Sequence, residues 1–440
     1  MLNPTKKEIQ NTLNQLFNYN FWFLPFSFIL LSSCATSKTN RLTKDITEVV
    51  NSSFYDNQFT GLLLVDPQKK DTLITLNSTK YFTPASNVKI ITLYSALQVL
   101  PQNIPTLKFL YQNDTLYAEP TGDPTWLHPY FKDSTALKFL KGYGKIALNF
   151  HSFHEDGFGP GWAWEDYQYY FSPERSALPL YGNVMTVFKP NAHDISPKYF
   201  KDSLIFKDKK PLRDLRLNSF RIPPTLTDTL EIPFLTSSRL TKALLQEKLN
   251  ADITINVGHP NGAKEVLYGI DTDSVYRRML YKSDNFLAEQ LMLTTSSIIS
   301  DTLKFSIARD HIFENHLSDL RQPPRWVDGS GLSRYNLFTP ESMVHVLSKL
   351  WHTVPRQRLF HLFPTWNAEG TIPKEKEATT NSFVHAKSGG MGNVYNLSGY
   401  LETKSGKHLI FSFMNNHFRQ PSSTVRQHMY HILKMVHDTY

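Results

Sequence analysis

Ser86-Asn87-Val88-Lys89, together with the apolar run that continues to Leu97, is the stretch that decides the fold. The run is mostly apolar and contains neither Gly nor Pro, which is typical of a buried helix. Pro84 stands just before it, and proline suits the first turn of a helix. Because residues i and i+3 share a helix face, we expect Ser86 and Lys89 to lie side by side near its N-terminus.

This pair can carry nucleophilic chemistry. A serine hydroxyl attacks well only when a neighbouring base takes its proton. Burial pushes a lysine toward its neutral form, and only the neutral amine can act as a base. The backbone N–H groups at a helix N-terminus also favour a developing negative charge. The alternative is that Ser86 is a helix cap and Lys89 a surface lysine. The chain contains no second S-x-x-K.

Two further motifs follow in order. Ser283-Asp284-Asn285 opens a second apolar stretch, residues 286–293, and the alternative is again a capping serine. Lys387-Ser388-Gly389 has a competitor in Lys404-Ser405-Gly406. The competitor separates two strand-like runs, 395–401 and 408–414, so we predict a hairpin turn there. Lys387 precedes that hairpin, as a residue on an active-site edge strand should.

The three motifs together resemble the S-x-x-K, S-D-N and K-T/S-G set of the penicillin-recognising serine enzymes. Most of the chain after about residue 45 resembles the D-alanyl-D-alanine carboxypeptidase/endopeptidase family, the class C low-molecular-mass penicillin-binding proteins of peptidase family S13. Three more stretches carry this likeness: Gly122-Asp123-Pro124-Thr125, Gly159-Pro160-Gly161-Trp162-Ala163-Trp164 and Asp328-Gly329-Ser330-Gly331-Leu332-Ser333-Arg334. We assign the Asp328 run no chemical role.

The resemblance implies a catalytic group and a substrate-binding group. Ser86 would be the nucleophile, Lys89 the base and Ser283 a proton relay to the leaving amine. The substrate would be held by Asn285 at an amide, by the strand residues Lys387 and Ser388 at its carboxylate, and by the Gly390 N–H, which with the Ser86 N–H makes an oxyanion hole. The family usually has a hydroxyl residue where this chain has Gly390, so one hydrogen bond to the terminal carboxylate is missing.

The implied function is a serine-type D-Ala-D-Ala carboxypeptidase that acts on peptidoglycan stem peptides through an acyl-enzyme on Ser86, with β-lactams as covalent inhibitors. Endopeptidase activity stays open. One alternative is a catalytically weak penicillin-binding or wall-binding lipoprotein, which Gly390 favours. Another is a β-lactamase, but we find no deacylating glutamate in a suitable loop. No G-x-S-x-G occurs, which argues against an α/β-hydrolase.

The motifs predict an α+β fold with a split, β-lactamase-like transpeptidase domain, in which helices flank an antiparallel sheet. We expect this catalytic domain to comprise residues 46–100 and 262–440. Residues 101–261 are rich in Pro, Tyr, Phe and short alternating runs, so we predict a mostly β insertion there. A hydrophobic content of 40% and an aromatic content of 13% are enough for real cores in both parts.

The N-terminal segment predicts where in the cell the protein is located. Residues 21–33 are an apolar run, too short for a transmembrane helix, that follows two lysines as in a secretory signal. Leu31-Ser32-Ser33-Cys34 resembles a bacterial lipobox, and Cys34 is the only cysteine. We therefore predict a signal peptide at 1–33, lipid attachment at Cys34 and a tether at 34–45. This implies a periplasm-facing lipoprotein anchored to a membrane of the bacterial envelope.

Two kinds of partner are not indicated. The net charge is +8, but the basic residues are scattered and form no nucleic-acid motif. The segment 151–156, which contains two histidines and two acidic residues, lacks H-E-x-x-H spacing. We expect neither a metal nor a cofactor.

Overall fold

The structure is a computed structural model. It describes residues 40–440 apart from Lys70, 190–193, 208–209, 256–257, 259 and 367–381. The predicted signal peptide and Cys34 lie outside the described residues.

The sheet that carries the third motif has five antiparallel strands in the order β13-β14-β15-β1-β2. The strands are β1 (Phe59–Asp66), β2 (Asp71–Leu76), β13 (Val384–Met391), β14 (Val394–Glu402) and β15 (His408–Asn416). Strands β14 and β15 are buried along nearly their whole length, because helices cover both faces of the sheet. Strand β13 is an edge strand, as predicted for Lys387.

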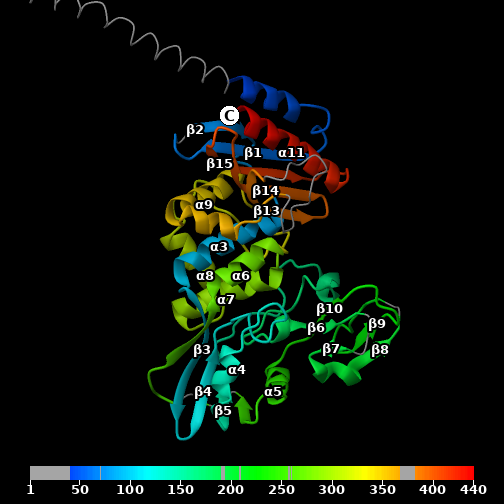
Figure 1. The fold of residues 1–440 in the computed structure, drawn as a ribbon, viewed down its shortest axis with the longest axis vertical. Helices are drawn as coiled ribbons and strands as arrows, with labels where there is room; N and C mark the ends of the chain where they lie inside the picture. The colour runs from blue at the N-terminus through cyan, green and yellow to red at the C-terminus, as the bar shows by residue number, and fades with distance from the viewer. Residues whose placement is uncertain are drawn as a thin grey trace, which may run out of the picture.

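Helices form a layer on each side of this sheet (Figure 1). On one face, residues 40–50 form a helix that shares a core with α11 (Ser422–Thr439). The other face is covered by a group of helices that share a second core. They are α3 (Val88–Val99), α6 (Thr272–Tyr281), α7 (Asn285–Ser300), α8 (Phe305–Asn315), α9 (Pro340–Thr353) and α10 (Arg356–Leu362). This is the α+β arrangement that the motifs predicted.

The predicted tether at 34–45 is wrong over residues 40–45, which form the first part of the helix at 40–50. Leu42 and Ile46 are four residues apart and so share one face of that helix. They are 2% and 0% exposed in the core beneath α11. Val50 joins them in the same core, so an apolar face within a largely polar segment docks the helix.

Residues after α3 cross into a second sheet of order β11-β5-β4-β3-β12, which lies beyond the helices in Figure 1. Its strands are β3 (Asn103–Gln112), β4 (Thr115–Pro120), β5 (Lys145–Leu148), β11 (Asp252–Ile255) and β12 (Glu265–Asp271). The β4–β5 and β5–β11 pairs are parallel. Parallel neighbours need crossovers, and α4 (Thr135–Leu140) and α5 (Ser238–Gln246) lie in them. The insertion is therefore less purely β than predicted.

Two small sheets complete this region. The first has the order β10-β6-β7 and the second pairs β8 with β9. Their strands are β6 (Val184–Val187), β7 (Ile195–Ser196), β8 (Leu204–Phe206), β9 (Phe220–Ile222) and β10 (Leu230–Pro233).

The chain leaves the insertion later than the predicted residue 262. Strand β12 pairs antiparallel with β3, so residues 265–271 belong to the second sheet. The next helix after β12 is α6, which begins at Thr272 and packs in the helical core beside the main sheet. Composition cannot show which partner a strand will pair with, so the predicted boundary fell before this strand.

Candidate active site

Ser86 lies in a one-turn 3-10 helix, η1 (Ala85–Asn87), which leads directly into α3. The Asn87 side chain joins this turn to the main sheet: its Nδ2 donates to the Lys387 carbonyl at 2.8 Å, and its Oδ1 accepts from Ser398 Oγ at 2.7 Å. Gly389 of β13 packs against the turn so closely that a Cβ would lie 2.5 Å from the Pro84 carbonyl oxygen. The turn that carries Ser86 is therefore fixed against the edge strand.

Lys89 is completely buried behind Ser86. Its Nζ donates to Ser86 Oγ at 3.0 Å, to Asn285 Oδ1 at 2.6 Å and to the Ser330 carbonyl at 2.7 Å. Burial lowers the pKa of Lys89 to about 8, although the charges of Asp328, Asp284 and Glu289 act in the opposite direction. The amine is thus held against the nucleophile, and a substantial fraction of it is neutral near pH 8.

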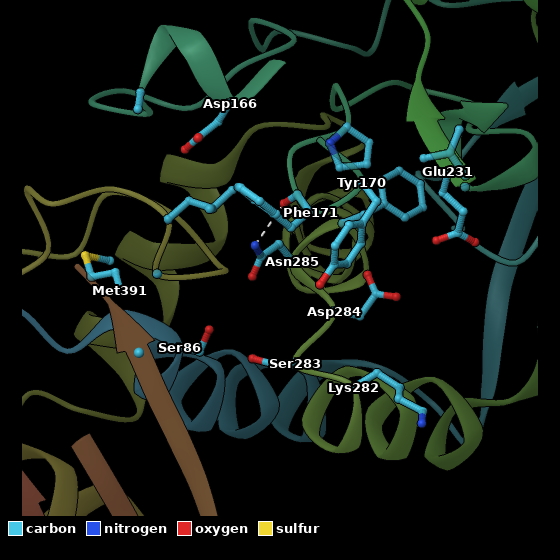
Figure 2. A pocket seen from close by; sticks show the side chains of 18 of the residues that line it. Ser86, Asp166, Tyr170, Phe171, Glu231, Lys282, Ser283, Asp284, Asn285 and Met391 are labelled. Carbon is cyan, nitrogen blue, oxygen red and sulfur yellow. Dashed lines mark hydrogen bonds between the residues drawn. The ribbon is translucent and has the colours of Figure 1, made fainter. Parts of the chain in front are cut away.

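Ser283 faces Ser86 across the pocket, and Figure 2 shows both hydroxyls in the same space. Ser283 does not cap α7: the cap is Asp284, whose carboxylate accepts from the Leu287 N–H at 3.1 Å. The backbone of Ser283 has φ of +54°, a left-handed conformation that is unfavourable for a residue with a side chain. The capping alternative for Ser283 is therefore wrong.

Asn285 lies at the start of α7 and links the catalytic part to the insertion. Its Oδ1 accepts from Lys89, and its Nδ2 donates to the Phe171 carbonyl at 2.9 Å (Figure 2). The Asn285 amide therefore fixes the position of the Lys89 amine. The predicted contact with a substrate amide stays a prediction.

Strand β13 brings Lys387, Ser388 and Gly390 to the same region. Lys387 is fully buried, and its Nζ donates to the Ser388 carbonyl at 2.6 Å. Burial, assisted by the charge of Lys89, lowers the pKa of Lys387 well below its ordinary value. The positive charge predicted for Lys387 is thus disfavoured unless an anion lies near it. Gly390 is exposed and lines the pocket.

The competing motif lies elsewhere. Lys404 follows β14 in the turn before β15. Its Nζ forms an ion pair at 2.8 Å with Asp438 of α11, which lies on the opposite face of the sheet from α3. The predicted hairpin turn is confirmed.

The loop that begins at Asp328 takes part in the site, although we assigned it no chemical role from its sequence. Its Ser330 carbonyl is one of the three acceptors of Lys89, and the Gly329 carbonyl accepts from Thr92 Oγ1 at 2.6 Å. The Asp328 carboxylate holds the loop in shape by accepting from the Gly331 and Ser333 N–H groups. Gly331 has φ of +85°, and a Cβ there would lie 2.0 Å from the Ala85 carbonyl oxygen.

A cavity of about 670 Å³ opens beside Ser86. Ser86, Ser283, Asn285 and Gly390 line it together. Charged residues that sequence reasoning did not single out also line it, and they are Asp166, Glu231, Arg278, Lys282 and Arg334. They come from elements far apart in the chain: Asp166 from a 3-10 helix, Glu231 from β10, Arg278 and Lys282 from α6 and its C-cap, and Arg334 from the loop that begins at Asp328.

This fold and site define a serine acyl-transfer enzyme in which a buried lysine neighbours the nucleophile. The chain belongs to the D-Ala-D-Ala carboxypeptidase 3 (S13) family, whose model matches residues 42–198 and 236–436. The predicted family and enzyme class are confirmed. Glu231 lies on β10 in the stretch between the two matched segments.

Two curated relatives are carboxypeptidases by name, in agreement with this family. D-alanyl-D-alanine carboxypeptidase DacB of Haemophilus influenzae is 34% identical over 94 residues, which cover 20% of each chain. Penicillin-sensitive carboxypeptidase A of Dictyostelium discoideum is 23% identical over 396 residues, 75% of this chain and 76% of the relative.

The fold is also that of a solved structure. The crystal structure of penicillin binding protein 4 (dacB) from Haemophilus influenzae superposes with a TM-score of 0.69 at 18% identity. The match covers 89% of this chain and 99% of the other. The predicted fold class is confirmed.

Proposed function

We propose that this protein removes the terminal D-alanine from peptidoglycan stem peptides through an acyl-enzyme on Ser86. The observation that carries the proposal is the 3.0 Å contact between Ser86 Oγ and the buried Lys89 amine, whose pKa burial lowers to about 8. We further propose that residues around the three motifs, about 46–100 and from the end of the insertion to 440, form the catalytic domain.

In the acylation step, neutral Lys89 takes the Ser86 proton as Oγ attacks the carbonyl of the D-Ala-D-Ala bond. The carbonyl oxygen becomes an oxyanion, which the Ser86 and Gly390 N–H groups would stabilise. The bond to the leaving D-alanine then breaks, and the Ser283 hydroxyl passes a proton to its amine. Ser283 lies in the same cavity as Ser86, as this relay requires.

The carboxylate of the substrate would lie near Lys387 and Ser388. An anion near Lys387 favours its protonated form, so substrate binding would restore the charge that burial disfavours. Water then hydrolyses the acyl-enzyme. A β-lactam would enter the same path, since the Haemophilus influenzae structure that shares this fold has also been solved in complex with one.

The test is the release of free D-alanine from a synthetic acyl-D-Ala-D-Ala peptide by the purified protein. Release that depends on Ser86 supports the proposal. A folded protein that binds the peptide but releases no D-alanine would favour the wall-binding alternative instead.

Gly390→Ser is expected to strengthen carboxypeptidase activity. A Cβ at Gly390 would meet only ordinary contacts, at 3.7 Å to Tyr395 and 3.8 Å to the Val394 carbonyl oxygen, so the side chain fits. A hydroxyl there can donate to the terminal carboxylate of the substrate. Such a hydrogen bond contributes about 1 kcal/mol, which predicts a KM for the peptide about fivefold lower. Steady-state D-alanine release measures it.

The matched control is Gly390→Ala, which adds the Cβ without the hydroxyl and should leave KM near that of the unchanged protein. Equal KM values for the Ser and Ala variants would show that the hydroxyl makes no contact with substrate.

Cys34→Ala is expected to move the protein from the membrane fraction to the soluble fraction or to block its processing. The reason is the lipobox-like sequence before Cys34, since a lipid can be attached only to that thiol. Ser37→Ala should leave the distribution unchanged. Immunoblots of separated fractions measure it, and membrane association that survives Cys34→Ala would exclude a lipid at this residue.

Within the described residues, no helix is both long enough and apolar enough to cross a membrane. We propose a periplasm-facing location on the strength of the N-terminal sequence and the family's cell-wall substrate.

A further inference from the structure

Glu289 lies directly behind the catalytic base. It stands one turn after Asn285 on α7, so the two side chains share a helix face. Glu289 is 1% exposed, and its Oε1 accepts from the Ser330 N–H at 2.8 Å. The carbonyl of the same Ser330 accepts from Lys89 Nζ at 2.7 Å. One backbone residue therefore connects the carboxylate to the amine.

The second oxygen of Glu289 has a different environment. Within the described part of the chain, Oε2 is buried and accepts no hydrogen bond. Its nearest cation is Arg175, whose Nη1 lies 3.7 Å away, and Arg175 also pairs with Glu155 at 3.1 Å. Burial, with the charge of Asp328, raises the pKa of Glu289 to about 7, while Arg175 and the Ser330 N–H favour its ionised form.

The charged groups around Lys89 come from several elements. Asp328 from its loop, Asp284 at the cap of α7 and Glu289 within α7 favour the protonated amine. Lys387 on β13 faces Lys89 with like charge. Glu289 differs from the other two carboxylates because it also accepts a hydrogen bond from the Ser330 N–H, and the carbonyl of Ser330 accepts from Lys89.

We propose that Glu289 is a positioning residue for acylation, which fixes the Ser330 carbonyl against Lys89 and whose negative charge contributes, with those of Asp328 and Asp284, to setting the pH at which Lys89 becomes a neutral base. This inference rests on the proposed role of Lys89. Within the Glu155–Arg175–Glu289 chain, Arg175 favours the ionised form of the buried Glu289 carboxylate and also pairs with Glu155.

The direction of the effect follows from electrostatics. A nearby anion stabilises the protonated amine and raises its pKa. Without the charge of Glu289, Lys89 would lose its proton at lower pH. It would also be a weaker base, because basicity falls with pKa.

Glu289→Gln tests this, because the amide keeps the shape and can still accept from the Ser330 N–H. The measured quantity is the rate constant for acylation by a fluorescent penicillin as a function of pH. The acidic limb, near the pKa of Lys89, is expected to move down by roughly one pH unit. Between pH 7, where Glu289 starts to ionise, and the limb, the variant should then be acylated up to roughly fivefold faster, while its alkaline plateau should fall.

The matched control is Glu155→Gln. This carboxylate binds the same arginine, but its other oxygen accepts from the Phe305 N–H rather than from Ser330. The limb of this variant should stay in place. If Glu289→Gln lowers the rate by one factor at every pH, Glu289 is merely structural and the proposal is wrong.

A second measurement, the titration of Glu289 itself, does not require the Glu289→Gln variant to fold. In protein with isotope-labelled glutamate carboxyls, the Glu289 resonance should titrate near neutral pH, because burial raises the pKa of Glu289 to about 7. Because linkage is mutual, Lys89→Met should raise that midpoint. An unchanged midpoint would overturn the inference. Full-rate acylation of Lys89→Met would instead overturn the proposed role of Lys89 as the base, so the two failures are distinct.

Discussion

Ser86→Ala is expected to abolish covalent labelling by penicillin and the release of D-alanine. Ser86 Oγ is the hydroxyl held at 3.0 Å by the buried Lys89 amine, and it lines the cavity beside the exposed Gly390. An alanine has no atom that could form the ester. Removal of a catalytic serine costs on the order of 10⁶ in kcat. Mass spectrometry of a penicillin-treated digest measures the adduct directly.

The matched control lies on α3, the helix into which the Ser86 turn leads. Ser95 Oγ donates to the Ile91 carbonyl at 2.8 Å, and the side chain is buried away from the cavity. Ser95→Ala should therefore keep full labelling. An adduct on a serine other than Ser86, or labelling that persists in Ser86→Ala, would show that the nucleophile has been misassigned.

Local pattern was sufficient for the parts of the site that lie within one element. The apolar run after Ser86 predicted α3, and the polar link at Lys404 predicted the β14–β15 turn. In both cases the apolar run or the turn residues lie within the element itself, so no distant partner is needed. The order of the three motifs then indicated which distant segments should meet.

Tertiary contacts decided the rest. The Ser330 carbonyl that accepts from Lys89 is 241 residues away in sequence, and any residue type presents a carbonyl. The Arg175–Glu289 pair also joins the insertion to α7, and no spacing rule connects them. Strand β12 and the helix at 40–50 were mispredicted for the same reason. The pairing of β12 with β3 and the packing of the helix beside α11 depend on segments that are distant in sequence.

Lys89→Met is expected to slow acylation by ~10²–10⁴, the usual loss when a general base is removed. Methionine fills a similar volume but cannot accept the Ser86 proton. In the unchanged protein the rate should rise with pH through about 8, because only the neutral amine is a base and burial has lowered the pKa of Lys89 to that value. The residual rate of the variant should lose this limb. Stopped-flow labelling with a fluorescent penicillin across a range of pH measures both effects.

Lys404→Met provides the matched control, since it removes a lysine of the same motif type whose partner, Asp438, is at the surface. Its rate and its pH limb should match those of the unchanged protein. A thermal melt is needed beside the kinetics, because Lys89→Met leaves Asn285 Oδ1 and the Ser330 carbonyl without their donor. If the folded variant is acylated at the full rate, another group takes the serine proton. Ser283, which faces Ser86 across the cavity, would then be the first residue to test.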